Sequence, residues 1–260
     1  MAPAVKHRHA VEGGYARGEE TRARIVTAAL RMFGERGFDA ASTRDIATSA
    51  GVNAPALQYY FDNKEGVYLA CVEHIAKRVW ENMSGVAANA ERALAEKADD
   101  AELIEAFCAM QAQLAQFMFT LEDADDWRLF MARLQSGEGP PAGFQMIYKQ
   151  VSGRITQVMA GIVGRLLGRP ANDDETLVRA TTLSGQLQVF QMARRSVLTK
   201  LNWDRIDGQR LELLKRIIRE HTSVLLHAMA KSRDSGSTVS KLHGKRPTAR
   251  AKRKLASRRA

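Results

Sequence analysis

The sequence predicts an all-α protein, with a three-helix helix-turn-helix head followed by a helical-bundle domain. Three observations support this fold class. Apolar residues recur at steps of three and four along most of the 260 residues, which is the spacing of amphipathic helices. Glycine, proline, asparagine and aspartate stand between these runs, where helices end and begin. Between Ser42 and Lys64, two short runs are separated by a glycine turn, as in a helix-turn-helix.

The first predicted helix runs from Glu19 to Arg36, where apolar residues recur at helical spacing, and Gly37 ends it. Residues 1–18 before it are polar and contain glycine, so we expect a flexible leader. An arm that touches DNA, of the kind that homeodomains use, is the alternative. The head is therefore expected to span residues 19–65.

Capping and turn residues predict the helix-turn-helix. Ser42 can cap the first short helix and Asn53 the second. Gly51, between them, can adopt the left-handed conformation that a sharp turn needs. Leu57 and Phe61, four residues apart, are expected to face the core. In this motif the second helix enters the major groove of DNA.

The rest of the chain predicts a helical domain over residues 66–231 and a disordered basic tail over residues 232–260. A long helix begins at Lys64 and joins the two domains. Asp99 or Asp100 can cap the helix that follows it, and Asn172 or Asp173 a later one. After the long helix, the expected helices cover 101–121, 124–134, 144–167, 173–200 and 209–231, with a loop at 136–143.

The net charge of +10 is concentrated at one end of the chain. Residues 231–260 hold 11 of the 39 lysines and arginines and one of the 29 acidic residues, so the remainder carries 28 charges of each sign. The charge therefore says little about the folded part. The tail can add salt-sensitive, sequence-independent DNA affinity, or it can simply be solvated.

The sequence gives no indication of a membrane protein or a secreted protein. Its longest uncharged run, Ala106 to Leu121, is shorter than a membrane span and contains three glutamines. The N-terminus lacks the apolar segment of a signal peptide, so we expect a cytoplasmic protein. Cys71 and Cys108 lie far apart in apolar helical surroundings and are expected to be buried free thiols.

Two stretches resemble known families. The run TRARIVTAALRMFGERGFDAASTRDIATSAGVNAPALQYYFDNKEGVYLACV, residues 21–72, resembles the N-terminal DNA-binding domain of the TetR family of transcriptional regulators, with its GF corner, TRDIA, AGV, YYF and NKEG in order. The second half, with WRLFMARL, LSGQLQVFQMARRSVL and REHTSVLLHAM, is similar to the C-terminal domain of the CerR or CecR type. It departs from that type at 139–144, where GPPAGF replaces a pattern closer to PTxAF.

The resemblance implies a homodimer that binds an operator and releases it when a small molecule binds. Carried over position by position, it implies eight DNA contacts: Thr43, Arg44, Ala54, Pro55, Ala56, Gln58, Tyr60 and Lys64. Arg44 can reach a phosphate or a guanine, and Gln58 can read an adenine. Thr43, Tyr60 and Lys64 resemble phosphate anchors. Each can instead be an ordinary solvated residue, and Tyr59 is expected in the core.

An effector pocket is expected among apolar residues and glutamines of the second domain: Phe107, Met110, Gln111, Leu114, Trp127, Phe130, Met131, Gln186 and Phe190. Ligand sites are mostly apolar with a few polar groups. A helical bundle needs the same apolar stripe for its core, so packing is the alternative.

A dimer interface is expected on the last two predicted helices, because the final helix is apolar on two faces, which is more than one buried side needs. The candidate interface residues are Leu183, Leu187, Val197, Leu211, Leu214, Ile218 and Leu225. The second apolar face carries Leu213, Ile217 and Val224. Packing within one chain is the alternative.

The expected function is a ligand-responsive transcriptional regulator, acting as a repressor that a small amphipathic molecule releases from a palindromic operator. A constitutive DNA-binding regulator without a ligand remains open, and so does a helical enzyme with a DNA-binding head. The sequence contains no Gly-rich phosphate loop, no GxSxG and no HExxH, and its six histidines form no local ligand set. We therefore expect no catalytic residue, metal or cofactor.

Overall fold

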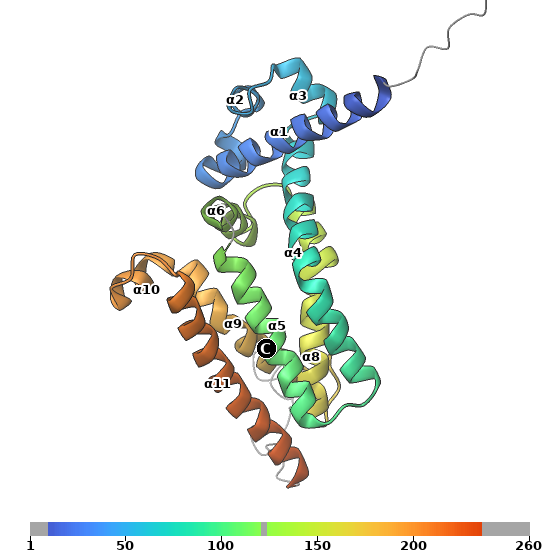
Figure 1. Ribbon diagram of the computed structural model, residues 1–260, viewed down its shortest axis with the longest axis vertical. Helices are drawn as coiled ribbons and strands as arrows, with labels where there is room; N and C mark the ends of the chain where they lie inside the picture. The colour runs from blue at the N-terminus through green and yellow to red at the C-terminus, as the bar shows by residue number, and fades with distance from the viewer. Residues whose placement is uncertain (1–9, 121–123, 236–260) are drawn as a thin grey trace, which may run out of the picture.

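The computed structural model describes residues 10–120 and 124–235, which form helices and loops without a strand (Figure 1). The predicted all-α fold class is confirmed. The elements are α1 (Ala10–Ala40), α2 (Thr43–Ser49), α3 (Ala54–Tyr60), α4 (Lys64–Ala95), α5 (Asp100–Thr120), α6 (Ala124–Gln135), α7 (Pro141–Ile147), the π-helix η1 (Tyr148–Ser152), α8 (Gly153–Leu167), α9 (Asp174–Met192), α10 (Arg194–Leu201) and α11 (Gly208–Asp234).

The helix boundaries follow the capping residues. The side chains of Ser42, Asn53 and Asp173 each accept a backbone N–H from the first turn of the next helix, over 3.1, 2.8 and 3.1 Å. Gly51, in the turn between α2 and α3, has φ +67°, a conformation that other residues adopt at a cost. These local interactions explain why the short helices of the head begin and end as the sequence predicts.

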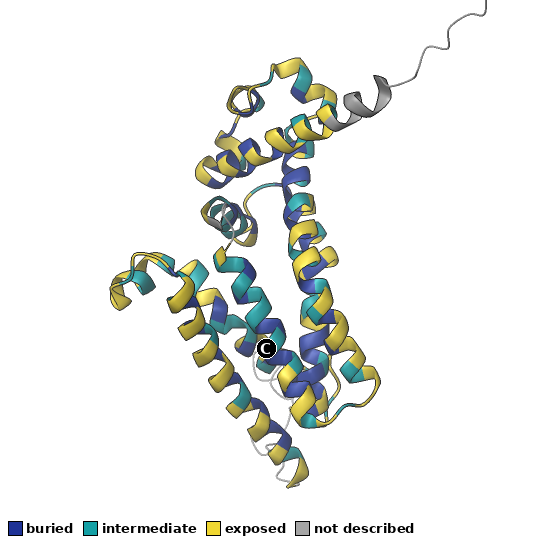
Figure 2. Ribbon diagram, in the orientation of Figure 1, coloured by how far each residue is buried: buried dark blue, intermediate teal, exposed yellow. Residues whose placement is uncertain are grey.

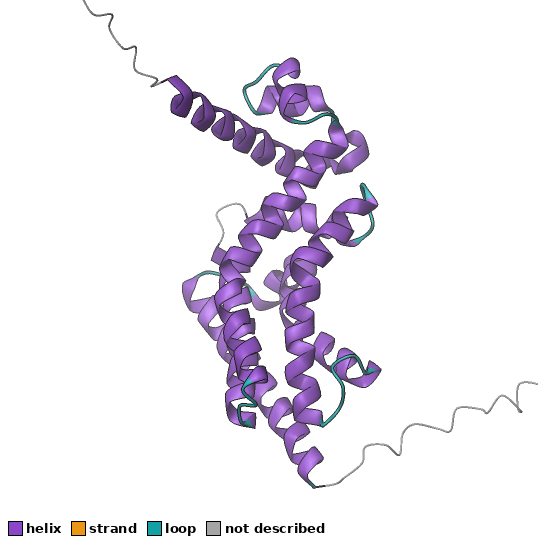
Figure 3. Cartoon of the chain, turned by 90° about the vertical axis from the view of Figure 1, so that its right-hand side faces the viewer, coloured by secondary structure: helices purple, strands orange, loops and turns teal. Residues whose placement is uncertain are grey.

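The molecule is elongated, with α1–α3 at one end and α4 running from this head along the body (Figure 1). A view turned by 90° shows α1 crossing the top of α4 (Figure 3). Buried residues form stripes on the inward faces of the helices, while their outer faces are exposed (Figure 2). One hydrophobic cluster joins head and body, because it contains Phe33 of α1, Tyr68 of α4 and Phe130 of α6.

The structure corrects four of the predicted helix boundaries. Helix α1 begins at Ala10, so residues 10–18 of the predicted leader are helical, and residues 1–9 lie outside the described residues. Pro141 starts α7 inside the predicted loop, which suits proline at a first helical position. The predicted 173–200 helix is broken at Ala193, whose backbone is not helical. Helix α11 ends at Asp234, so residues 232–234 of the predicted disordered tail are helical, and the tail from residue 236 onward lies outside the described residues.

Candidate DNA-binding surface and effector cavity

Helix α3 packs on the head through one face and leaves the other open. Leu57 and Phe61 are buried in the cluster shared with α1 and α4. The exposed face carries Ala54, Pro55 and Gln58. This arrangement leaves a short helix free to enter a groove.

The eight predicted contacts divide by exposure. Arg44, Ala54, Pro55 and Gln58 are exposed, while Thr43, Ala56, Tyr60 and Lys64 are half-buried. Neighbouring charges are partly paired. The Arg36 guanidinium lies 3.3 Å from the Asp45 carboxylate, and Arg31 donates to the Ser49 hydroxyl at 2.9 Å, so both arginines hold α2 against α1. Arg44 has no such partner among the described side chains.

The two tyrosines of α3 lie in different environments. Tyr59 is 85% exposed, so the prediction that it belongs to the core is wrong. Tyr60 packs against the core cluster, and its hydroxyl lies beside Gly18 of α1. The reason is helical spacing: Tyr60 follows the buried Leu57 by three residues and stays near its face, whereas Tyr59 turns away.

Lys64 is fixed at the start of α4. Its Nζ donates to the Asp39 carbonyl at 3.0 Å and lies 4.6 Å from the centroid of the Phe38 ring. An ammonium has three N–H donors, so those not bound to Asp39 remain available at the rim of the head.

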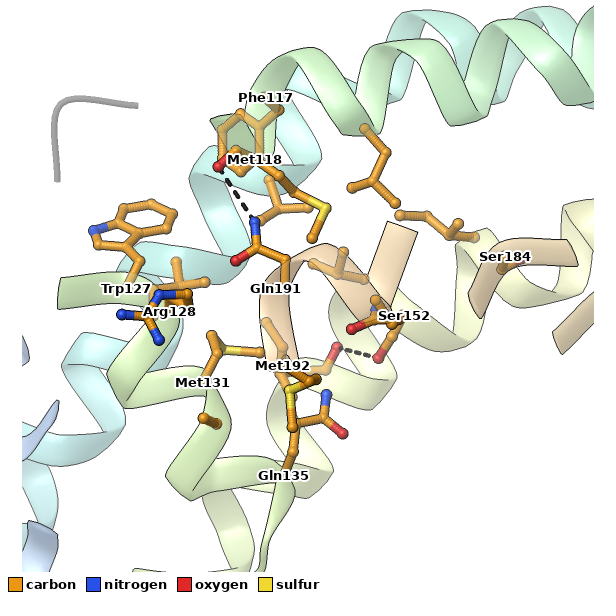
Figure 4. Close-up of a pocket in the computed structure, with 18 of the residues that line it drawn as sticks. Phe117, Met118, Trp127, Arg128, Met131, Gln135, Ser152, Ser184, Gln191 and Met192 are labelled. Atoms are coloured by element: carbon orange, nitrogen blue, oxygen red, sulfur yellow. Dashed lines mark hydrogen bonds between the residues drawn. The ribbon is translucent and has the colours of Figure 1, made fainter. Parts of the chain in front are cut away.

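A cavity of about 290 Å³ lies in the body, lined by residues of α4, α5, α6, α7, η1, α8 and α9 and partly open to solvent (Figure 4). Its walls are mainly apolar. The polar side chains that line it are Arg128, Gln135, Ser152, Thr156, Ser184, Gln188 and Gln191. The mixture of an apolar wall and few polar groups is that of a small-molecule site.

Three of the nine predicted pocket residues line this cavity: Leu114, Trp127 and Met131. The other six lie elsewhere: Phe107, Met110, Gln111, Phe130, Gln186 and Phe190. Phe107 and Met110 are fully buried in the core of the body. Phe130 faces the head: its ring centroid lies 6.5 Å from that of Phe33 of α1 and 4.9 Å from that of Tyr68 of α4. Phe190 packs in a separate cluster between α5, α9 and α11.

The two glutamines outside the cavity join three helices. Gln111 of α5 and Gln186 of α9 both donate to the Leu183 carbonyl, at 2.9 and 3.2 Å, and Gln186 also donates to the Thr222 hydroxyl of α11 at 3.0 Å. Gln111 is only 2% exposed, and its Oε1 has no described partner. These amides therefore satisfy buried polar groups in the bundle.

Lining residues from α4 and from the α7–η1 segment, including Ile75, Val79, Ile147 and Val151, were not predicted from the sequence. For Ile147 at the end of α7 and Val151 in η1 no signal was available, because a change from α-helix to π-helix inside an apolar run does not alter the pattern of residue types. Ile75 and Val79 were visible as apolar residues of a long helix, but not as cavity residues.

Helix α6 contacts both the cavity and the head. Trp127, Arg128 and Met131 line the cavity. On another face, Arg133 donates from Nε to the Gly34 carbonyl at 2.8 Å and from Nη2 to the Glu35 carbonyl at 3.1 Å. Both acceptors belong to α1, so one helix connects the cavity wall to the DNA-binding head.

Most of the predicted dimer residues point inward. Leu183, Leu187, Leu211, Leu214 and Ile218 are buried within the subunit, so these five predictions are wrong for a surface of the folded subunit. Val197 is half-buried and Leu225 is exposed. The final helix has two apolar faces, and the one chosen from the sequence packs against α5.

Exposed apolar side chains do lie on the same two long helices. They are Val178 and Val189 of α9 and Leu213, Ile217, Val224 and Leu225 of α11. Gly185 lies between the two valines of α9, with open space around the position of a Cβ. We call these six apolar residues the α9–α11 surface.

Both cysteines are buried free thiols, as predicted. Burial raises the pKa of each thiol above its ordinary value. Within residues 10–120 and 124–235, no cluster of three or more His, Cys, Asp or Glu side chains could hold a metal ion. None of the described helices is long and apolar enough to cross a membrane.

Comparisons with known proteins agree with both sequence resemblances. Residues 25–71 match the family described as "Bacterial regulatory proteins, tetR family", and residues 103–229 match "HTH-type transcriptional dual regulator CecR, C-terminal domain". The HTH-type transcriptional dual regulator CecR of Shigella flexneri is 28% identical over 214 residues, which are 82% of this chain and 95% of that protein.

Solved structures share the fold. A protein from Pseudomonas aeruginosa PAO1, described as a transcriptional regulator, aligns with a TM-score of 0.54 at 17% identity, over 87% of this chain and 96% of its own. AibR, crystallised in complex with isovaleryl coenzyme A and operator DNA, aligns with a TM-score of 0.52 at 15% identity, over 79% of this chain and 97% of its own.

Proposed function

Since the chain belongs to the TetR family of transcriptional regulators and carries a CecR-type C-terminal domain, we propose that it is a ligand-responsive repressor. In this proposal a homodimer binds a palindromic operator and releases it when a small amphipathic molecule enters the cavity. The observation that carries the proposal is the position of α6, which lines the cavity on one face and contacts α1 on another.

The DNA contacts are proposed on the exposed surface of α2 and α3. Gln58 and Arg44 are the candidate base readers, and Ala54 and Pro55 offer apolar contact that suits thymine methyl groups. We add Tyr59, because an 85% exposed tyrosine beside Gln58 can donate its hydroxyl to a phosphate. The half-buried Thr43, Ala56, Tyr60 and Lys64 are proposed at the edge of this contact.

Dimerisation is proposed through the α9–α11 surface. Exposed apolar side chains on two adjacent long helices can form a four-helix contact with a second copy, and Gly185 lets the helices approach closely. Of the residues predicted from the sequence, Leu225 belongs to this surface. A twofold dimer presents two α3 helices, which requires half-sites about 34–36 Å apart or a multiple of that distance.

The switch requires that the effector favour a subunit in which the two heads no longer match the operator. A ligand that displaces Trp127 or Met131 displaces α6, and with it the Arg133 contacts to α1. Helix α4, which runs from head to body, is the second connection. AibR was crystallised with both an acyl coenzyme A and operator DNA, which supports a fold that serves two kinds of ligand.

The experiment is operator binding with and without a panel of amphipathic compounds, once the operator has been selected from random DNA. Thr156→Trp, at a residue that lines the cavity, should reduce compound binding and operator release but leave DNA affinity unchanged. Gln157→Trp is the matched control, because the neighbouring side chain is exposed and does not line the cavity. Equal behaviour of the two variants would contradict the assigned cavity.

A constitutive regulator without a ligand is the second candidate, and it is favoured if no compound changes operator affinity. We propose no enzymatic activity, since one matched family is described as bacterial regulatory proteins and the other as a domain of a transcriptional dual regulator. Because the proposed target is the operator DNA, we place the protein in the cytoplasm.

A further inference from the structure

One charged side chain lines the described wall of the cavity. Of the residues that form this wall, only Arg128 is ionised at neutral pH, and the others are apolar side chains, amides and hydroxyls. Arg128 lies beside Trp127 at one side of the cavity, and Ser184 lies on the opposite side (Figure 4). The cavity therefore has one cationic side, on α6.

The guanidinium of Arg128 has N–H donors that are available to a ligand. Its Nε lies 3.4 Å from the Asp125 carboxylate, whose side chain is 71% exposed and whose Oδ1 also lies 3.8 Å from Nε of Arg194. Such a shared, solvated ion pair contributes little stability. Neither Nη atom of Arg128 has a hydrogen-bond partner among the described residues, although the side chain is only 26% exposed.

Among the described residues, the opposite side of the cavity carries hydroxyl groups and apolar side chains but no charged side chain. The Ser184 hydroxyl already donates to the Ala180 carbonyl at 2.8 Å, and it lies 3.3 Å from the sulfur of Met159. Leu114 and Ile155 complete an apolar lining there with Met159. A ligand that fits this distribution has a polar group at one end and a hydrocarbon chain at the other.

We propose that the effector is a medium-chain carboxylic acid whose carboxylate is bound by Arg128 and whose chain extends toward Met159; this rests on the cavity being the effector site. An arginine fork binds a carboxylate through two parallel hydrogen bonds. A neutral ligand would bury the guanidinium without replacing its hydration, which is unfavourable, and a cationic ligand would be repelled. Because a water molecule occupies about 30 Å³ of liquid, a cavity of about 290 Å³ has room for the roughly ten heavy atoms of octanoate, so octanoate is a suitable probe.

In this proposal the ligand acts on helix α6. The carboxylate would compete with Asp125 for Arg128 and draw the guanidinium toward the cavity. Arg133, on the same helix, holds the carbonyls of Gly34 and Glu35 in the head. Binding of an acid thus acts directly on the connection between cavity and head.

The test compares octanoate with octanamide, a neutral molecule of the same shape, and with octylammonium, using the full-length protein. Isothermal titration should show octanoate binding most tightly and octylammonium not at all. Arg128→Met should weaken octanoate binding at least about tenfold, the effect of losing a charge-assisted hydrogen bond, and leave octanamide binding equal or tighter. Arg128→Lys should restore part of the octanoate affinity, since it keeps the charge.

Arg78→Met is the matched control, because Arg78 also lies against Trp127, 5.5 Å from the ring centroid, but does not line the cavity. It should leave all three affinities unchanged. Octanamide binding as tightly as octanoate, or an unaltered octanoate affinity in Arg128→Met, overturns the acid assignment and leaves the cavity as an effector site. The acid assignment also fails if octanoate does not bind while another compound does. If no compound of a broad amphipathic panel binds or releases the operator, the proposed function itself fails.

Discussion

Substitution of Gly34 by alanine tests whether α6 is packed rigidly against the DNA-binding head. Gly34 is buried in α1, and a Cβ added there would lie 3.1 Å from the Asp126 carbonyl oxygen, 3.2 Å from Cβ of Leu129 and 3.2 Å from the Phe130 nitrogen. Two of these three atoms belong to the α6 backbone. They cannot move without moving the helix.

The expected free energy combines two opposing effects. Alanine is favoured over glycine inside a helix by about 0.8–1.0 kcal/mol. Overpacking a tight contact costs about 1–3 kcal/mol. The variant should therefore be between neutral and about 2 kcal/mol less stable than the parent. Gly85→Ala is the control, because Gly85 is exposed in α4 with nothing within 4 Å of a Cβ, and it should gain about 0.5–1 kcal/mol.

Urea unfolding of both variants at one protein concentration measures these differences, since the midpoint reports stability and dimer stability depends on concentration. Operator affinity measured in parallel should fall for Gly34→Ala, because a displaced α6 carries the Arg133 contacts with it, and stay unchanged for Gly85→Ala. If Gly34→Ala gains as much stability as Gly85→Ala and both variants bind operator normally, α6 moves to accommodate the added methyl group without loss of stability. That result refutes the inference that α6 transmits ligand binding to the head.

Four further predictions follow from the described surfaces. Gln58→Ala should weaken operator binding by about 1–3 kcal/mol through one base position and relax the base preference at that position. If selection from random DNA gives the same motif for the parent and the variant, Gln58 does not read a base. Ile217→Glu should produce monomers in size-exclusion chromatography and weaken operator binding, whereas Gln209→Glu, exposed on the same helix, should remain dimeric. Deletion of 236–260 should flatten the salt dependence of non-specific DNA binding, and an unchanged slope would leave a merely solvated tail. Burial raises the pKa of Tyr68 from 10.0 to about 12, so its contribution to stability is complete below pH 10 and lost as pH rises to about 12; unfolding of Tyr68→Phe should lack this decline.

The head could be predicted from the sequence because its signals are local. Ser42 and Asn53 accept hydrogen bonds from residues three positions ahead, and Gly51 needs only its own φ angle to form the turn. Such interactions do not depend on the rest of the fold, so a pattern of residue types is enough to locate them. Tyr59 was assigned wrongly to the core because two adjacent aromatic residues, Tyr59 and Tyr60, differ only by a 100° rotation about the helix.

The cavity and the proposed dimer surface could not be located in the same way. Both depend on which face of a helix meets its neighbours, and the periodicity of α11 gives two apolar faces without ranking them. Leu214 and Leu213 are adjacent and chemically identical, yet one is buried and the other is exposed. A cavity is the volume that several helices leave unfilled. Leu114 and Met110 lie on the same helix, and only the packing of the other helices decides that Leu114 lines the cavity while Met110 is buried in the core.

The hydrogen bonds that converge on the Leu183 carbonyl have a consequence for the choice of DNA sequence. Gln111, Gln186 and Thr222 fix the register of α5, α9 and α11, because a slip of one residue along any of them would leave buried amides unpaired. That register sets the rotation of the α9–α11 surface about the body, and in the proposed dimer this rotation sets the distance between the two heads. In the proposed dimer, the number of base pairs between half-sites is thus determined partly in the hydrophobic core, by three polar side chains outside the proposed DNA contact.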